Sequence, residues 1–180
     1  MIAIDRNIIF LPPEHLMNEP HGSKFFNGQY HLFYQHNPQI QYWNHIHWSH
    51  AVSSDLVRWR DVPFVLSPEK GDIAPDCCWS GGTVIDDEGV PVISYAAGDK
   101  RQDPDQSLAM ARSSFLVDGN NDLIDWIKYS HYVATLPEGV GLRGNFRDPF
   151  VWKEESMWYM LVTTSIPGRG KRLGCRERVR

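Results

Sequence analysis

The feature that most constrains the fold is a loose repeat along the chain. Three compact polar turns, each followed by a hairpin-like pattern, occur at Asn18-Glu19-Pro20, Trp79-Ser80-Gly81 and Arg147-Asp148-Pro149. A second landmark, Asp-Leu-x-x-Trp, occurs at 55–59 and again at 122–126, 67 residues further on. Self-similarity at a fixed period is typical of architectures in which each unit buries its faces against its neighbours. We therefore expect a chain built from similar units packed side by side.

The pattern within each unit predicts short strands. Residues 24–35 place Asn27-Gly28 between two aromatic-rich runs, a strong hairpin signal because both residues accept positive φ. Residues 82–97 repeat this design around Asp87-Glu88-Gly89, and residues 149–163 repeat it around positions 154–156. No helical period is sustained. About four short strands per unit predict an all-β fold of the β-propeller type.

Composition describes an ordinary globular protein with an unusual end. The chain has 180 residues, is 42% hydrophobic and carries a net charge of −4, which argues against a nucleic-acid surface or a polybasic membrane anchor. Residues 169–180 hold six basic residues and one acid, leaving 12 basic and 21 acidic residues, a net −9, in 1–168. Because the last segment also lacks strand alternation, we predict one domain over 1–168 and an atypical basic tail over 169–180.

Cysteine and histidine give no sign of a metal or disulfide framework. The adjacent Cys77 and Cys78 cannot supply evenly spaced bridges or a zinc site, and we expect them to pack as small apolar groups. The five histidines between 31 and 50 are interpreted as packing and hydrogen-bonding groups, so no metal or cofactor is predicted. No apolar run approaches the roughly 20 residues of a membrane span, and the N-terminus resembles no signal peptide. These features favour the cytoplasm.

Two acids stand at equivalent turns of the repeat. Glu19 and Asp148 each precede a proline, which is expected to hold the backbone of the acid extended. In a propeller the first strand of each unit runs along the central axis, so side chains from separate units converge there. The pair is open to two interpretations: catalytic carboxyl groups, or ordinary turn residues.

A family resemblance decides between them. The segment Leu16–Gly22 resembles the W-M-N-D-P-N-G box of glycoside hydrolase family 32, the β-fructosidases (invertases, inulinases and levanases) and related fructosyltransferases. Further boxes stand in the family's order at residues 33–38, 48–59, 79–81 and 146–149. A related furanosidase family acting on arabinose or xylose polymers is disfavoured by the last two boxes.

The resemblance implies a fold and a mechanism. The fold is a five-bladed β-propeller, of which this chain would cover two and a half to three blades. Its funnel would bind a fructosyl unit of sucrose or fructan and cleave the glycosidic bond with retention. This chemistry needs two carboxyl groups about 5–5.5 Å apart, one attacking the anomeric carbon and the other protonating the leaving oxygen. Glu19 matches the nucleophile and Asp148, beside Arg147, the transition-state stabiliser. The remaining matches are sugar-contacting positions, namely Asn18, Gln35, Trp43, Trp79 and Ser80.

Two departures keep alternatives open. The family's usual nucleophile is Asp, so Glu19 adds one methylene, and the family's acid/base Glu has no counterpart, because Glu177 comes too early. We expect a chain truncated before that acid, with self-association through an open blade edge. The alternatives are fructosyl transfer, in which an acceptor sugar replaces water, and a non-catalytic, degenerate carbohydrate-binding propeller.

Overall fold

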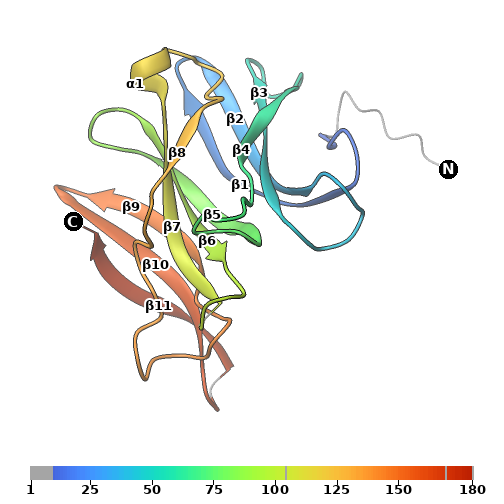
Figure 1. Cartoon of the computed structure of the whole chain (residues 1–180). Coiled ribbons are helices and arrows are strands. Elements are labelled where there is room, and N and C mark those ends of the chain that lie inside the picture. The colour runs from blue at the N-terminus through green and yellow to red at the C-terminus, as the bar shows by residue number, and fades with distance from the viewer. Residues whose placement is uncertain (1–9, 104, 169, 180) are drawn as a thin grey trace.

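The computed structural model describes residues 10–103, 105–168 and 170–179, the last range by its backbone alone. The described chain is all-β, with three antiparallel sheets and one short helix (Figure 1). The first sheet has the order β1 (Leu16–Phe26), β2 (Gln29–Asn37), β3 (His47–Ser53), β4 (Arg60–Leu66). The second has the order β5 (Cys77–Ile85), β6 (Pro91–Gly98), β7 (Gln106–Ser113), β8 (Trp126–Lys128), with α1 (Phe115–Asp118) before β8. The third has the order β11 (Gly170–Val179), β10 (Met157–Ile166), β9 (Arg147–Glu154).

The predicted hairpins are confirmed. Asn27 and Gly28 join β1 to β2 with φ values of 44° and 82°, the positive values that the Asn-Gly pair indicates. In the second hairpin the carboxylate of Asp86 accepts hydrogen bonds from the backbone N–H groups of Glu88 and Val90. The third hairpin turns between Glu154 and Met157.

The two Asp-Leu-x-x-Trp segments take the same local structure. Each lies between the third and fourth strands of its sheet. Leu56 and Leu123 both have positive φ, and the indole N–H groups of Trp59 and Trp126 donate to the carbonyls of these leucines at 3.2 and 2.7 Å. The repeat found in the sequence is therefore a structural repeat.

The end of the chain corrects one expectation. Gly170–Val179, which shows no strand alternation, pairs along its length with β10 as strand β11. An antiparallel ladder is made by backbone groups, so it forms without an apolar and polar alternation. Arg169 and Arg180 lie outside the described residues, and the domain boundary at residue 168 stays a prediction.

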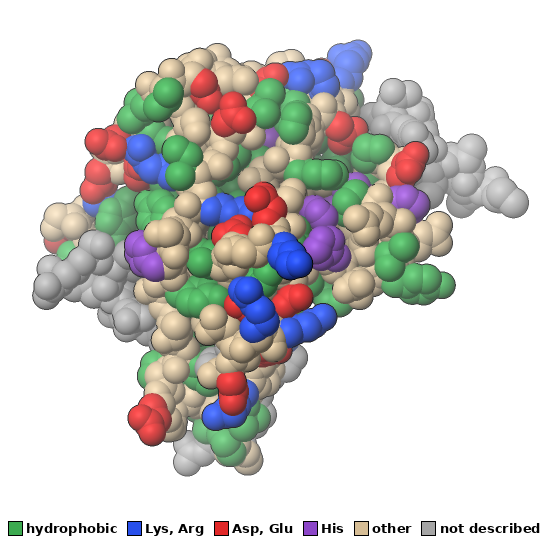
Figure 2. Space-filling view, in the orientation of Figure 1, with side chains coloured by type: hydrophobic (Ala, Val, Ile, Leu, Met, Phe, Trp, Pro, Cys, Tyr) green, Lys and Arg blue, Asp and Glu red, His purple; other side chains and the backbone are tan. Residues whose placement is uncertain are grey.

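Two apolar clusters join the sheets. One is shared by the first and second sheets and contains Trp48 and Tyr95, both fully buried. The other is shared by the second and third sheets and contains Phe146 and Met160. On the face shown in Figure 2 basic and acidic side chains are interleaved. Among the described residues, no helix is long and apolar enough to cross a bilayer.

Candidate active site

The site is built from irregularities in the first strand of each sheet. In β1, β5 and β9 two residues face one residue of the neighbouring strand, so each strand bulges and turns a side chain out of the ladder. The bulged pairs are Asn18-Glu19, Trp79-Ser80 and Asp148-Pro149. Strand β5 packs between β1 and β9. Three separate sheets therefore present their irregular residues to one place.

Glycines let these strands approach closely. A Cβ atom on Gly81, directly after the β5 bulge, would lie 1.9 Å from the carbonyl oxygen of Ser94 in β6. Gly22 in β1 has a φ of 63°, and a Cβ there would meet the Thr83 hydroxyl of β5 at 2.5 Å. Both glycines are required by backbone geometry, which explains why they follow the polar turns.

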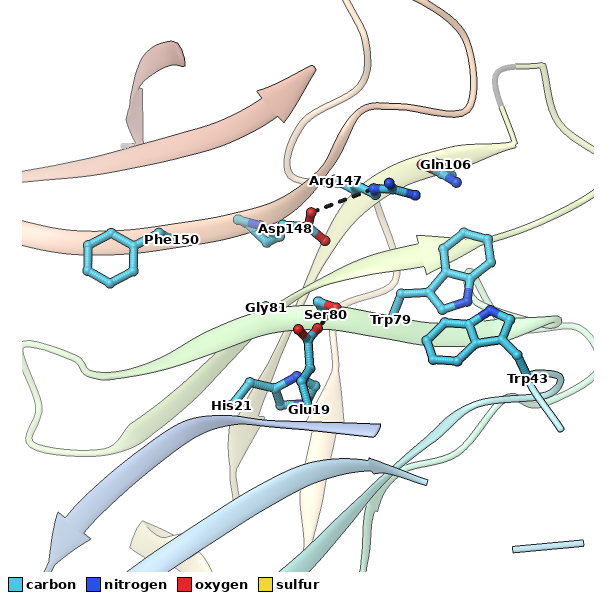
Figure 3. Close-up of a pocket in the computed structure, with 11 residues that line it drawn as sticks. Glu19, His21, Trp43, Trp79, Ser80, Gly81, Gln106, Arg147, Asp148 and Phe150 are labelled. Atoms are coloured by element: carbon cyan, nitrogen blue, oxygen red, sulfur yellow. Dashed lines mark hydrogen bonds and ion pairs between the residues drawn. The ribbon is translucent and has the colours of Figure 1, made fainter. Parts of the chain in front are cut away.

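These residues line a cavity of about 670 Å³ (Figure 3). Of the described residues that line it, two carry carboxyl groups, Glu19 and Asp148, and they extend from β1 and β9 toward each other across β5. The structure brings both acids into the lining of one cavity. Two such groups can supply a nucleophile and a negative charge that stabilises a cationic transition state.

A chain of hydrogen bonds holds Glu19. The Asn18 amide donates to Gln35 Oε1 at 2.9 Å, and Gln35 Nε2 donates to Ser80 Oγ at 2.6 Å. Ser80 Oγ in turn donates to the Glu19 carboxylate. Gln35 is fully buried, so both ends of its amide are used inside the protein. The longer side chain of Glu19 is thus fixed by a hydroxyl from the neighbouring sheet.

Asp148 is held differently. Its φ is 56°, in the left-handed region, so the extended backbone predicted from Pro149 is wrong at this position. The bulge of β9 imposes this conformation, which Asp tolerates better than most residues because its side chain is short and polar. Its carboxylate lies 3.6 Å from Arg147 Nε, and the ion pair places one positive charge beside the two acids.

Aromatic groups form the walls of the cavity. Trp43 and Trp79 lie together at one end, and Phe150 lies at the other (Figure 3). Trp43 is 52% exposed, which leaves its indole open to a ligand, whereas Trp79 is half-buried. Such surfaces stack against the apolar faces of sugar rings.

Most of the residues predicted from the sequence come together here. Those that line the cavity directly are Glu19, Trp43, Trp79, Ser80, Arg147 and Asp148. Asn18 and Gln35 stand behind it and are joined to it through Ser80. Their matched role as sugar contacts stays a prediction, and in this structure their amides bond to protein groups.

The cavity also has residues that the sequence did not single out. His21 packs on Trp48 with ring centroids 3.8 Å apart, and burial lowers its pKa to about 3, so its ring is neutral. It belongs to the Leu16–Gly22 box and stands where the family consensus has Asn. This difference is the sequence feature that could have marked His21 as a residue of the site. Gln106 begins strand β7, whose apolar character gave no hint of a site.

The histidines between residues 31 and 50 and the two adjacent cysteines are not among the residues that line the cavity. His31 Nδ1 and His50 Nε2 are 3.0 Å apart in the core, and His36 bonds to the Ser49 hydroxyl at 2.6 Å. Cys77 and Cys78 are buried free thiols whose pKa values are raised by burial, which makes them unreactive. These groups pack as expected.

The fold and this cavity define a β-sheet domain with two acids in one cavity, and comparison with known proteins gives its family. The model of the glycosyl hydrolases family 32 N-terminal domain matches residues 10–173. The chain belongs to glycoside hydrolase family 32.

Individual relatives agree with this assignment. The chain is 37% identical over 166 residues to sucrose-6-phosphate hydrolase of Escherichia coli, a match covering 87% of the chain and 31% of the relative. It is 38% identical over 160 residues to 6(G)-fructosyltransferase of Asparagus officinalis, covering 85% and 25%. Fructan 1-exohydrolase IIa from Cichorium intybus superposes with a TM-score of 0.81 at 29% identity, over 98% of this chain and 34% of that one. The chain thus spans a quarter to a third of the length of these relatives.

Proposed function

We propose that the protein to which this chain belongs cleaves β-fructofuranosides with retention of configuration. The observation that carries the proposal is the meeting of Glu19 and Asp148 in one cavity of a family 32 domain, with Arg147 beside them. We further propose that the complete fold is a five-bladed propeller, of which the three sheets described here form the first blades.

The proposed chemistry has two steps. A carboxylate oxygen of Glu19 forms a bond to the anomeric carbon of the fructosyl unit, and the glycosidic carbon–oxygen bond breaks. Its electron pair goes to the leaving oxygen, which takes a proton from an acid other than Glu19 and Asp148. Water then attacks the same carbon, gives a proton to the conjugate base of that acid and releases Glu19. Asp148 stabilises the positive charge that develops on the sugar ring, and Arg147 forms an ion pair with Asp148.

Sucrose or a fructan is the proposed substrate. The named relatives include a sucrose-6-phosphate hydrolase and a fructan 1-exohydrolase, the latter also solved in complex with 1-kestose. Fructosyl transfer is the alternative within the same chemistry, since an acceptor sugar can replace water at the covalent intermediate. A fructosyltransferase among the relatives supports keeping it.

A specific observation favours a second candidate, carbohydrate binding without turnover. The described lining of the cavity has two carboxyl groups, and both already have roles, so neither is left to protonate the leaving oxygen. General acid catalysis of this kind typically contributes about 10²–10⁴-fold. A test of the nucleophile must therefore use a leaving group that needs no proton.

The 180-residue chain should be incubated with a β-fructofuranosyl fluoride. We expect release of fluoride and a covalent fructosyl ester on the peptide that contains Glu19, detected by mass spectrometry. Glu19→Gln should abolish the ester because an amide oxygen is a poor nucleophile. The matched control Glu138→Gln, at an exposed position outside the cavity, should leave it unchanged.

The alternative gives a different result. If the chain binds fructose but forms no ester and releases no fluoride, the protein is a binding module and the catalytic proposal is wrong.

A further inference from the structure

We infer that Gln106 is a further specificity-determining residue, which binds a hydroxyl group of the fructosyl unit. The inference rests on the proposed function, because it requires a sugar in the cavity. It concerns a residue on the third strand of the second sheet, whereas the bulged residues all come from first strands.

Gln106 carries an unsatisfied polar group at the wall of the cavity. The residue lines the cavity and is 7% exposed. Its carbonyl oxygen Oε1 is buried and has no hydrogen-bond partner among the described residues. Turning the amide over would bury the NH₂ group in the same place, so either orientation needs a partner. Leaving such a group unpaired is unfavourable, and a bound hydroxyl would give it a partner.

Trp79 offers a second such group on the wall of the cavity, and in Figure 3 its indole nitrogen faces Trp43. The indole Nε1 of Trp79 is also buried without a partner among the described residues. The sheet explains why the side chains of Trp79 and Gln106 are neighbours. Gly98 pairs with Cys77 on one side and with Gln106 on the other, and the six-membered ring of Trp79 lies over Gly98, where a Cβ would meet it at 3.0 Å. Glycine at position 98 therefore lets the indole lie flat next to Gln106.

The two unpartnered groups match the chemistry of a sugar hydroxyl. Trp79 Nε1 can only donate a hydrogen bond, and Gln106 Oε1 can only accept one. A sugar ring carries several hydroxyl groups, each able to donate to Gln106 Oε1 or to accept from Trp79 Nε1, whereas an apolar ligand satisfies neither group. The end of the cavity that holds Trp43 and Trp79 thus selects for a hydroxylated ring with an apolar face.

The position of Gln106 indicates which sugar is contacted. In Figure 3 its side chain lies next to the Arg147 guanidinium, above the Trp79 indole. Ser80, the residue after Trp79, bonds to Glu19, and Arg147 bonds to Asp148. Gln106 therefore lies on the wall of the cavity beside the ion pair of Arg147 with Asp148. We assign its contact to the fructosyl unit itself.

The test measures binding of D-fructose and its monodeoxy derivatives to the 180-residue chain by calorimetry. One derivative should bind about 3- to 10-fold more weakly than fructose, corresponding to one neutral hydrogen bond. Gln106→Met should weaken fructose binding by a similar factor, and it should make that derivative and fructose bind equally. Gln106→Glu keeps an acceptor oxygen and should retain the discrimination. Gln102→Met, at an exposed position, is the matched control.

The outcomes separate this inference from the proposed function. If the unsubstituted chain binds no fructose, the proposed function is overturned and this inference with it. If it binds fructose but Gln106→Met changes neither the affinity nor the discrimination, the inference about Gln106 alone is overturned. Circular dichroism tests whether each variant is folded. If Gln106→Met does not fold, fructose binding by Gln106→Glu is the second measurement of the inference.

Discussion

At the scale of single residues, two groups set the position of the Glu19 carboxylate: the methylene by which Glu is longer than Asp, and the hydroxyl of Ser80. Ser80 on the neighbouring sheet donates to the carboxylate, and the buried Gln35 fixes Ser80. The longer acid is therefore matched to this particular bulge of β1. The usual family residue, Asp, would place its carboxylate about 1.5 Å further back, one carbon–carbon bond short.

We therefore expect Glu19→Asp to slow reaction with a β-fructofuranosyl fluoride by about 100-fold, because a displacement on the order of 1 Å is enough to cost that much. The measurement is the initial rate of fluoride release. The control Glu138→Asp should be without effect. A rate equal to or above that of the unsubstituted chain would mean that Ser80 does not position the nucleophile.

Sequence reasoning found the acids and the tryptophans because they stand in turns whose residue types are unusual for a strand. It could not show that Gln35 turns both ends of its amide inward, since a sugar contact and a protein contact use the same donor and acceptor. Gln106 was missed for a related reason. It begins a strand that reads as core, and its unsatisfied oxygen is a property of the packed structure.

At the scale of elements, the bulges depend on close contact between strands. Gly81→Ala should push β5 away from β6, because its Cβ would overlap the Ser94 carbonyl oxygen. We expect a loss of about 3 kcal/mol in the free energy of unfolding, as for other severe overpacking. Urea denaturation measures it. The neighbouring Gly82→Ala meets only an ordinary contact at 3.8 Å and should be close to neutral. Equal effects would contradict this account of β5.

The histidine pair between β2 and β3 predicts how stability depends on pH. Burial lowers the pKa of His31 to about 4, although the Asp122 carboxylate acts to raise it. Burial also lowers the pKa of His50 well below 6.5, and the positive charge of Arg60 lowers it further. Below pH 6.5 the unfolded chain binds protons that the folded chain does not, so stability is full above that pH and falls toward pH 4.

Urea midpoints measured between pH 7 and pH 5 should show this fall. His50→Asn should make it shallower without removing it, because burial also lowers the pKa values of His21 and His47. His131→Asn, at an exposed position, should leave it unchanged. A midpoint independent of pH over this range would show that the pKa values of these histidines are not lowered in the fold.

The hairpins and the Asp-Leu-x-x-Trp turns were predictable because local residue types determine them. Asn27-Gly28 needs positive φ at both positions, and each tryptophan bonds back to a leucine three residues earlier. Strand β11 was not predictable in this way, because its partner β10 supplies the ladder. The bulges were not predictable either, because a bulge is defined by how the residues of two strands pair, and this pairing forms only in the folded sheet.

At the scale of the whole molecule, one face of β9 exposes aromatic side chains. Phe150, 61% exposed, and Trp152 follow each other on one face of β9, with ring centroids 5.9 Å apart, and Trp152 stacks on Tyr159 at 5.5 Å. The opposite face, with Val151 and Met160, packs in the core. Exposed aromatic surface of this kind favours association.

We predict that the 180-residue chain self-associates through this face. Sedimentation velocity should show oligomers at micromolar concentration, and Trp152→Lys should shift them toward monomer. Val117→Lys replaces an 88% exposed residue far from the third sheet and should not. A monodisperse monomer at all concentrations would overturn the prediction.

The division of the cavity among three sheets has a further consequence. β1, β5 and β9 belong to separate sheets, so the width between Glu19 and Asp148 is set by side chains at the seams, such as the contact of Gly22 with Thr83. A change of volume at a seam moves one carboxyl group relative to the other while every ladder stays intact. Evolution can therefore adjust reaction geometry and substrate preference from positions that never touch the sugar, and each sheet can vary without rebuilding the other two.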